Sequence, residues 1–585
     1  LRTAYFGELH VHTMNSPDAY QLNVRSNVRD AYRFALGEAI DHSSGVTIQL
    51  SQPLDFIAVT DHAEYMAILP MLADPDSELA SSRTARALAS EDPEQVRKAQ
   101  FELLMSMGEG KPIDALVEPT LRNRIWEHYV ELAREYYRPG EFTTLIGYEW
   151  TSAGGPDNGV NLHRNVLFRS DQVPAHPYSS FDSYNPEDLW QWMDQQRAAG
   201  IALLAIPHNA NLSNGLMFSG TQTFDGRPMD ASYAEQRLRN EPVVEITQIK
   251  GSSETHPALS PNDEWAGFEI LDDLLGGTGA YSEPRGSYVR DAWLTGLKLE
   301  EDEDYNPYRF GVIGSTDSHN AASQMEENNY HGKIGDADGT PEARRGGSFI
   351  NKHHIRYSAS GLAGVWAESN TREDIYDALA RREVFATTGP RISLRVFGAW
   401  QWPEAVLDAH DWVEQAYRDG VPMGRELPAP NGSAQAPELL IWAVKDPASA
   451  WLQRVQVIKG WLDKGQPSEQ VYDVACADEL TPDPVTHRCP DNGATVSLET
   501  CDFDKHRGDT QLKTRWRDPD FQPAQRAFYY VRVLENPTCR WSTWDSLRTG
   551  LPLATDVPPT IQERAYSSPI WYRPVADRQL ADTRQ

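Results

Sequence analysis

The residues best suited to chemistry in this chain are histidines and carboxylates that stand where short apolar runs meet polar loops. Imidazole and carboxylate together form the ligand set of borderline, Lewis-acidic metal ions such as zinc, manganese and iron. One structural ion takes about four protein ligands, so this set exceeds the needs of a single ion. We therefore predict a site for several metal ions and, from it, a metal-dependent hydrolase. The candidate ligands are His10, His12, Asp18, His62, Glu149, His163, His208, Asp317 and His319.

The spacing of the first two histidines carries the most information. His10 and His12 flank Val11 after an apolar start. In an extended strand residues i and i+2 point to the same side, so both imidazoles can reach one ion, whereas a helix would separate them. A lone histidine near a strand end is more often a hydrogen-bonded structural residue. That alternative is hard to sustain for the whole set.

The apolar runs themselves predict the scaffold. Helix-like segments at 119–137, 186–199 and 287–300 alternate with the runs, and this alternation predicts a parallel α/β architecture. If the sheet closes into a barrel, the loops at the carboxyl ends of its strands form one rim and bring the ligands together. His163 is the exception, because it begins its run instead of ending it. The seven runs cover residues 3–9, 54–60, 143–149, 163–168, 201–207, 243–247 and 309–315.

The segments that carry these residues resemble the motifs of the PHP superfamily, named for polymerase and histidinol phosphatase. The resemblance rests on GELHVHTMNSPDAY, VTDHAE, IGYEW, IPHN and GSTDSH. The longer segments IPHNANLSNG, QIKGSSETHP and ALARREVFATTGPRI are more similar to a branch of PHP-related proteins labelled as a domain of unknown function. Together the motifs span residues 1–390.

The resemblance implies a distorted seven-stranded (β/α) barrel that holds two or three divalent ions of zinc, manganese or iron. Many relatives have a histidine where this chain has Asp18, and a carboxylate there favours manganese or iron. Asp61 is expected to orient a neighbouring imidazole. The implied ligand sets are His10, His12, Glu149 and Asp317 for one ion, Glu149, His163 and His208 for a second, and Asp18, His62 and His319 for a third.

The expected chemistry is hydrolysis by a hydroxide that bridges the metal ions, because a metal-bound water acquires a pKa of about 7. No G-x-S-x-G elbow and no G-x-x-x-x-G-K-[ST] phosphate loop occurs in the sequence. The resemblance favours a phosphoesterase. Two alternatives stay open: a metallohydrolase of another bond (amide, carboxyl ester or phosphotriester), and a non-catalytic, secreted, metal-dependent binding protein.

Four residues are the candidates for catalysis and substrate contact. Glu149 is expected at the centre of the metal site. Lys250, which follows the sixth apolar run, can meet an anionic group, as can Arg164 beside His163 and Asn209 beside His208. The structural alternatives are surface cations and a loop-capping amide. The expected substrate is a small anionic molecule.

Composition limits the partners. The chain has 85 acidic and 54 basic residues and a formal charge of −31. Such a surface repels nucleic acid, whose binding depends on Lys and Arg. No apolar run approaches the roughly 20 residues that span a bilayer, so we expect neither a nucleic acid partner nor a membrane span. The oligomeric state is left open.

The length of 585 residues predicts two or three domains. We expect a metal-binding barrel at 1–390, with a helical insertion at 64–140, and a β-sandwich-like accessory domain at 391–585. Thr371 with Asp374 predicts a helix start by a capping box. Beyond Gly389-Pro390 the pattern changes to alternating strands at 392–397, 439–444, 455–459 and 528–533.

All four cysteines lie in the last quarter of the chain. Of the three possible pairings we favour Cys476–Cys489 with Cys501–Cys539. Disulfides indicate an oxidising compartment, and a start at Leu1 without a leader fits a removed signal peptide. We therefore expect a periplasmic or secreted protein. The alternative is a cytoplasmic protein with four free thiols.

Overall fold

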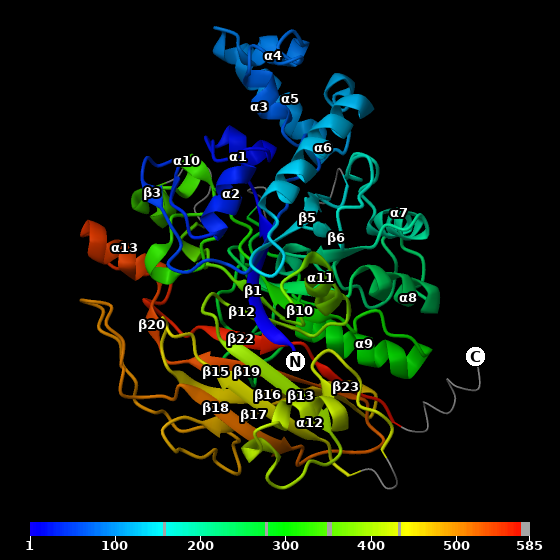
Figure 1. The fold of residues 1–585 in the computed structure, drawn as a ribbon, viewed down its shortest axis with the longest axis vertical. Helices are drawn as coiled ribbons and strands as arrows, with labels where there is room; N and C mark the ends of the chain where they lie inside the picture. Colours follow the sequence, from blue (N-terminus) through cyan, green and yellow to red (C-terminus); the bar gives the residue numbers. More distant parts are fainter. Residues whose placement is uncertain (156–158, 275–278, 348–353, 431–434, 575–585) are drawn as a thin grey trace.

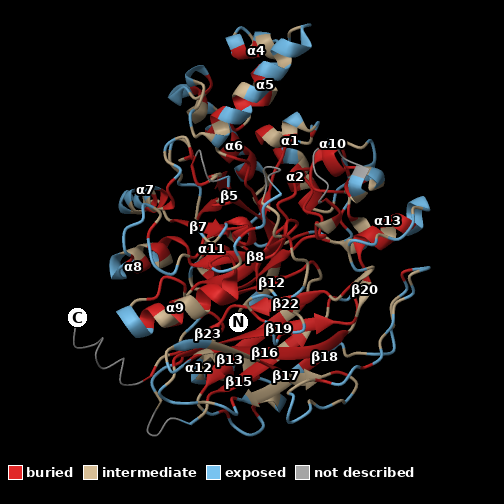
Figure 2. Ribbon diagram, turned by 180° about the vertical axis from the view of Figure 1, so that it is seen from behind, coloured by how far each residue is buried: buried red, intermediate tan, exposed pale blue. Residues whose placement is uncertain are grey.

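The computed structural model describes residues 1–155, 159–274, 279–347, 354–430 and 435–574. In these residues the chain is a mixed α/β, two-domain protein built on one large central sheet (Figure 1). Buried residues concentrate along the strands, whereas the outlying helices expose much of their surface (Figure 2). No helix in the described part of the chain is long and apolar enough to cross a bilayer.

Every one of the seven apolar runs is a strand. Five of them belong to the central sheet, in which β1, β4 and β5 are parallel neighbours and β6 runs antiparallel to both β5 and β7. The other two, β8 and β10, pair in parallel in a smaller sheet that also contains β9 (Gly251–Ser252). The seven strands are β1 (Thr3–Val11), β4 (Phe56–Val59), β5 (Thr143–Trp150), β6 (Arg164–Phe168), β7 (Leu203–Pro207), β8 (Val243–Gln248) and β10 (Gly311–Gly314).

The closed barrel is not confirmed, because the sheet does not close among the described residues. One edge of β1 pairs with β4 and the other pairs antiparallel with β11 (Leu362–Ala367), so β10 cannot form a regular ladder with β1. Strand β8 contacts β7, and β10 contacts β11 and β12 (Val384–Thr387), without ladder pairing. A single bridge between Val11 and Ser318 joins β1 to the segment after β10. That bridge lies at the carboxyl ends of the strands.

Helices cover this arrangement. The predicted helical segments correspond to α6, α7 and α9, and Thr371 caps α11 by accepting a hydrogen bond from the Asp374 amide. Between residues 64 and 140, helices α3 to α6 surround a small apolar cluster of their own, and α4 and α5 project from one end of the molecule (Figure 1). The main helices are α1 (Pro17–Gln21), α2 (Val28–Ala35), α3 (Ile68–Ala73), α4 (Arg83–Leu88), α5 (Pro93–Gly108), α6 (Pro119–Tyr136), α7 (Pro186–Ala198), α8 (Ala231–Asn240), α9 (Val289–Glu303), α10 (Gly335–Asp338), α11 (Arg372–Ala380), α12 (Trp412–Asp419) and α13 (Trp541–Thr549).

The C-terminal part of the chain is rich in strands, as its alternating pattern predicts. A four-stranded sheet with the order β14-β13-β15-β18 shares an apolar core with the β17-β16-β19 end of the central sheet. Strand β22 pairs with β12, so the central sheet runs without interruption from N-terminal into C-terminal strands. The boundary near residue 390 stays a prediction. The strands are β13 (Ser393–Ala399), β14 (Val421–Pro422), β15 (Glu438–Val444), β16 (Leu452–Asp463), β17 (Gln466–Cys476), β18 (Gln511–Arg517), β19 (Ala527–Glu535), β20 (Thr538–Cys539), β21 (Thr560–Ile561), β22 (Arg564–Ser567) and β23 (Ile570–Tyr572).

A buried ionic network holds the loop after β8 against the C-terminal strands. Arg290 of α9 and Arg532 of β19 both contact Glu254 and Asp263, at 2.8–3.0 Å. Arg290 and Arg532 are completely buried. Because an unpaired buried charge is costly, removal of one member would destabilise the others. The network therefore fixes the segment that begins at Lys250.

The favoured cysteine pairing is present in the structure: Cys476 is bonded to Cys489 and Cys501 to Cys539. A disulfide stabilises a fold largely by restricting the unfolded chain, more so for a longer loop. The sequence separations are 13 and 38 residues, respectively. Cys501 lines a cavity together with Pro390 and Arg391, which follow β12.

We expect the double variant Cys501→Ser/Cys539→Ser to lower the free energy of unfolding by about 4 kcal/mol, and Cys476→Ser/Cys489→Ser by about 3 kcal/mol, because the first loop is longer. Urea denaturation of the two variants and the oxidised wild type measures both values. A larger loss for the shorter loop would contradict the chain-entropy explanation.

Candidate metal centre

Strand β1 and the residue that follows it carry three buried ionisable side chains. Glu8, His10 and His12 are at positions i, i+2 and i+4 and are all completely buried. The segment after β10 docks on this strand: the Asp317 amide donates to the His10 carbonyl and the His12 amide donates to the Ser318 carbonyl, each at 2.7 Å. Asp317 has a φ of 58°, a left-handed conformation that non-glycine residues rarely adopt outside constrained sites.

Glu149, at the end of β5, lies between two groups of histidines. Its Oε2 is 3.1 Å from His10 Nε2 and 3.0 Å from His12 Nε2. Its Oε1 is 2.9 Å from His163 Nδ1 and 3.5 Å from His208 Nε2. His62 Nδ1 also lies 3.4 Å from Oε1. Each carboxylate oxygen therefore faces its own group of imidazoles, which is the arrangement that a bridging ligand requires.

His163 belongs to this group because β6 runs antiparallel to β5. The first residue of β6, Arg164, pairs with Trp150 at the end of β5. The start of β6 thus lies at the same edge of the sheet as the carboxyl ends of its neighbours. The strand direction explains why His163 precedes its apolar run whereas most of the other ligand candidates follow theirs.

Asp317 completes the first group and His319 begins a third. Asp317 Oδ1 is 3.3 Å from His10 Nε2 and 3.4 Å from His12 Nε2. Asp18 lies between two other imidazoles: its Oδ2 is 3.0 Å from His319 Nε2 and its Oδ1 is 3.4 Å from His62 Nε2. The structure thus brings all nine predicted ligands to one edge.

Three observations indicate that these residues are suited to bind metal ions. Two ligand atoms bound about 2.1 Å from one ion lie roughly 3.0 Å apart at a right angle and roughly 3.4 Å apart at a tetrahedral angle, which matches the separations above. Within the described residues, His12 Nε2 and both ring nitrogens of His208 are buried and make no hydrogen bond. Four groups could hold an ion: His10, His12, Glu149 and Asp317; Glu149, His163 and His208; His12, His62 and His319; and His10, His208 and Glu245.

The two carboxylates at the centre are ionised. Burial by itself would raise the pKa of Glu149, but the surrounding histidines, His62 and His208 foremost, hold it well below its usual range. Burial opposes ionisation of Asp317 in the same way, and Lys250, Lys333 and His10 hold the pKa of that carboxyl well below its usual range. A carboxylate that is ionised before the ion arrives is ready to coordinate it.

Side chains behind the histidines set their tautomers. His10 Nδ1 is 2.9 Å from Glu245 Oε2. A hydrogen bond from Nδ1–H to this carboxylate would leave Nε2 to coordinate an ion. His12 Nδ1 contacts the Ser16 hydroxyl at 2.9 Å, and that hydroxyl donates to Asp61 at 2.7 Å. Asp61 was expected to orient an imidazole. In the structure the Ser16 hydroxyl links its carboxylate to the His12 ring.

Three residues of this centre were not predicted. Glu8 accepts hydrogen bonds from the His10 and Thr316 amides, and burial raises its pKa to about 8. Its two-residue spacing from His10 was a usable signal. Glu245 lies inside the apolar run of β8, where a charged side chain is unfavourable unless it has a partner. Lys333, whose Nζ lies 2.6 Å from His319 Nδ1, follows no strand and gave no signal.

The candidates for substrate contact differ in their placement. Lys250 Nζ is 2.6 Å from Asp317 Oδ2, within the metal centre. Asn209, at a φ of 50°, accepts a hydrogen bond from Gln248 Nε2, which also donates to Asp317. Arg164 donates instead to Glu241 at 2.9 Å, and its side chain is almost completely buried.

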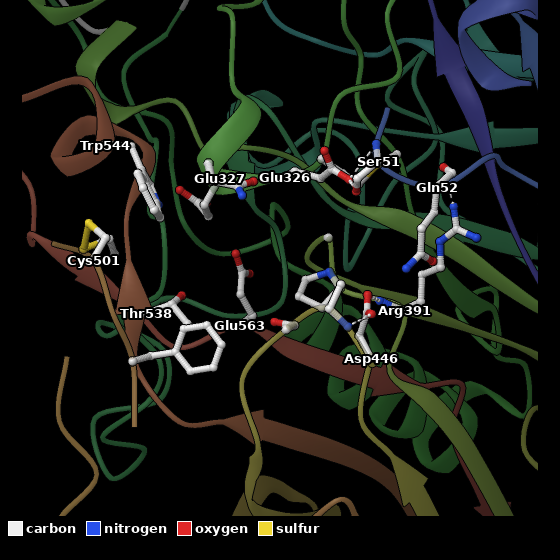
Figure 3. Close-up of a pocket in the computed structure, with 18 residues that line it drawn as sticks. Ser51, Gln52, Glu326, Glu327, Arg391, Asp446, Cys501, Thr538, Trp544 and Glu563 are labelled. Atoms are coloured by element: carbon white, nitrogen blue, oxygen red, sulfur yellow. Dashed lines mark hydrogen bonds between the residues drawn. A yellow bond between two sulfur atoms is a disulfide. The ribbon is translucent and has the colours of Figure 1, made fainter. Parts of the chain in front are cut away.

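A separate cavity lies where the segment after β10 meets the Cys501–Cys539 disulfide. It has a volume of about 160 Å³, and Glu327, Glu563 and Trp544 are among its lining residues (Figure 3). None of the nine ligand candidates is among the described residues that line it. This cavity is therefore distinct from the metal centre.

We expect Glu245→Gln to weaken metal binding by about 10- to 100-fold, because the amide no longer fixes the His10 tautomer through a charged hydrogen bond. Competition with a chromogenic chelator measures the affinity. Glu235→Gln, on an exposed position of α8, is the matched control. Equal affinities in the two variants would contradict the role of Glu245.

The comparisons with known proteins place the chain in a family. No curated protein matches it. A solved structure, a two-domain protein containing predicted PHP-like metal-dependent phosphoesterase from Bacteroides vulgatus ATCC 8482, is similar at 13% identity and a TM-score of 0.29, over 96% of this chain and 95% of the other. The family model of DUF3604, a protein of unknown function, matches residues 1–574. The chain therefore belongs to the DUF3604 family.

Proposed function

We propose that this protein is a metal-dependent hydrolase that acts on phosphate esters. The observation that carries the proposal is the position of Glu149, whose two carboxylate oxygens face two separate groups of histidines. A carboxylate in this position can bridge two ions. Paired ions a few ångströms apart are typical of enzymes that hydrolyse phosphate esters.

Bound divalent ions would acidify a water molecule and polarise the phosphoryl group of the ester. The chain's own residues prepare the site for this. Glu245 and the Ser16–Asp61 pair direct the Nε2 lone pairs of His10 and His12 inward. The left-handed turn at Asp317 aims its carboxylate back at the same histidines. Lys250 and Asn209 stand beside that carboxylate, where an anionic substrate would bind, whereas the guanidinium of Arg164 is engaged by Glu241.

The choice of phosphate esters as the substrate class rests on the resemblance of the five motifs to the PHP superfamily. A ligand set of this kind also serves hydrolysis of amides, carboxyl esters and phosphotriesters, since the fold alone does not determine the substrate. Two or three ions of zinc, manganese or iron are compatible with the donor set. The four possible groups share His10, His12, Glu149 and His208, so not all of them can be occupied independently.

We propose a periplasmic or secreted location, in line with the two disulfides. Disulfides persist in oxidising compartments and are rare in the cytosol. The part of the chain after residue 390 is proposed as an accessory domain. The Arg290–Arg532 network supports a role in holding the Lys250 loop.

We expect purified protein to contain two or three divalent ions and to hydrolyse aryl phosphate esters in a chelator-sensitive manner, with activity restored by zinc, manganese or iron. Elemental analysis and a panel of mono-, di- and triesters measure this. Bound metal without phosphoesterase activity would direct the search to other bonds. A protein that takes up no metal under any of these conditions would end the proposal.

We expect Glu149→Gln to lower kcat by about 100-fold or more and to reduce the number of bound ions, because an amide is a poor bridge between two cations. Steady-state kinetics and elemental analysis of the same preparation measure both effects. Glu131→Gln on the exposed face of α6 is the control. Full activity with a full metal complement in Glu149→Gln would refute the bridging role.

A further inference from the structure

Two lysines approach the same carboxylate at the metal centre. Lys250 Nζ lies 2.6 Å from Asp317 Oδ2, and Lys333 Nζ lies 3.5 Å from Asp317 Oδ1 and 2.6 Å from His319 Nδ1. They come from different segments, one after β8 and the other before α10. Lys333 is not within any of the sequence motifs that mark the metal ligands.

The backbones of both lysines are fixed to the segments that carry the ligands. The His319 amide donates to the Lys333 carbonyl at 2.8 Å, and the Lys333 amide donates to Asp338 at 2.7 Å. Gly332, at a φ of 85°, leaves no room for a side chain, since a Cβ there would lie 2.3 Å from the Asp338 carbonyl oxygen. The backbone of Lys333 is therefore fixed, and its side chain is buried against His319 and Asp317, unlike that of a surface lysine.

The backbone of Lys250 is held in a similar way. Its amide donates to Gln248 Oε1 at 2.7 Å, and its carbonyl accepts from Asn211 Nδ2 at 3.0 Å. Gln248 in turn donates to Asp317 at 2.9 Å. Asp317 thus has one oxygen toward the histidines and the other toward Lys250 and Gln248.

The charges around Asp317 are not balanced by a simple ion pair. Elsewhere in this chain, buried Lys459 pairs with one carboxylate, Asp518, at 2.7 Å. At the metal centre two lysines share Asp317, which also faces two histidines. Divalent ions bound by the same residues would add further positive charge. The carboxylates of Glu149 and Glu245 also face Lys250, and that of Asp18 faces Lys333. Divalent ions bound by these carboxylates would offset their charge, so the metal-loaded centre would favour an anionic ligand at the two ammonium groups.

The side chains of the two lysines are slightly less buried than those of three of the histidines. His10, His12 and His208 are completely buried, whereas the side chains of Lys250 and Lys333 remain 9% and 7% exposed. Asp18, which contacts His319 beside Lys333, has a side chain that is 44% exposed. A small anion entering beside Asp18 would meet the two ammonium groups next to the ligand cluster.

We propose that Lys333 and Lys250 form a cationic pair that binds the oxygens of a doubly charged phosphate group, so that the preferred substrates are phosphate monoesters. This inference rests on the proposed phosphoesterase function. A monoester is a dianion near neutral pH and can satisfy both ammonium groups. A diester carries one charge and a triester none, so each leaves the pair partly unsatisfied.

The test uses inorganic phosphate as a probe, so that binding is measured apart from turnover. Metal-loaded wild type, Lys333→Met, Lys250→Met and the control Lys459→Met are compared by calorimetry, with elemental analysis of each preparation. We expect phosphate to bind about 10- to 100-fold more weakly to each of the two metal-centre variants, with the metal content intact, because each loses a charge-assisted hydrogen bond. Lys459→Met should retain wild-type affinity.

Kinetics with a matched aryl monoester and diester provide the second measurement. We expect kcat/KM for the monoester to fall about tenfold or more in Lys333→Met, with a smaller loss for the diester. Lys333→Arg, which keeps the charge, should recover part of the monoester activity. Equal losses for both esters would overturn the assignment of the pair to a dianion.

Other outcomes separate this inference from the proposed function. If the wild type hydrolyses phosphate esters but Lys333→Met binds phosphate normally, the inference is wrong and the proposed function stands. If Lys333→Met loses metal while its reloaded form binds phosphate normally, Lys333 only positions His319 and the inference is wrong. If metal-loaded wild type neither binds phosphate nor hydrolyses any ester, both are wrong.

Discussion

Burial of many ionisable groups at one edge of the sheet is the constraint on which the rest of this structure depends. Imidazoles and carboxylates removed from water are costly unless each is paired or coordinated. At this edge Glu149 and Asp317 are surrounded by His10 and His12 at separations near 3 Å. So many ionisable groups can be held this close together only by a rigid framework. The adjacent strands form that framework.

The pairing of β1 with its neighbours holds the ionisable groups together without closure of a barrel. β1 is occupied on both edges, yet the segment after β10 still reaches it through two backbone hydrogen bonds at His10 and His12. This segment therefore joins β1 at the edge that carries the candidate ligands, although the sheet does not close among the described residues. The reversed direction of β6 brings His163 to that edge as well.

The C-terminal strands affect the metal centre through their contacts with the loop after β8. None of the nine candidate metal ligands lies in these strands. β22 continues the central sheet from β12, and Arg532 of β19 reaches Glu254 in the loop that begins at Lys250. A buried charge network of this kind is weak evidence for added stability, but it specifies one arrangement of the loop. The C-terminal strands thus contact the side of the centre where the two lysines lie.

The sequence by itself determined the seven strands, the nine ligand candidates and the strand-rich C-terminal part, because these depend on local apolar periodicity and on residue type at fixed spacing. Glu8 was within reach of the same argument, being two residues before His10. Tertiary structure alone decided that the sheet stays open in the described part of the chain, that Asp61 contacts His12 through Ser16, and that Glu245 and Lys333 join the centre. Those contacts join residues far apart in the chain, and they depend on strand order and on the paths of loops that no local pattern encodes. Lys333 shows this most clearly, since its backbone is held beside His319 by a hydrogen bond between its own carbonyl and the amide of His319.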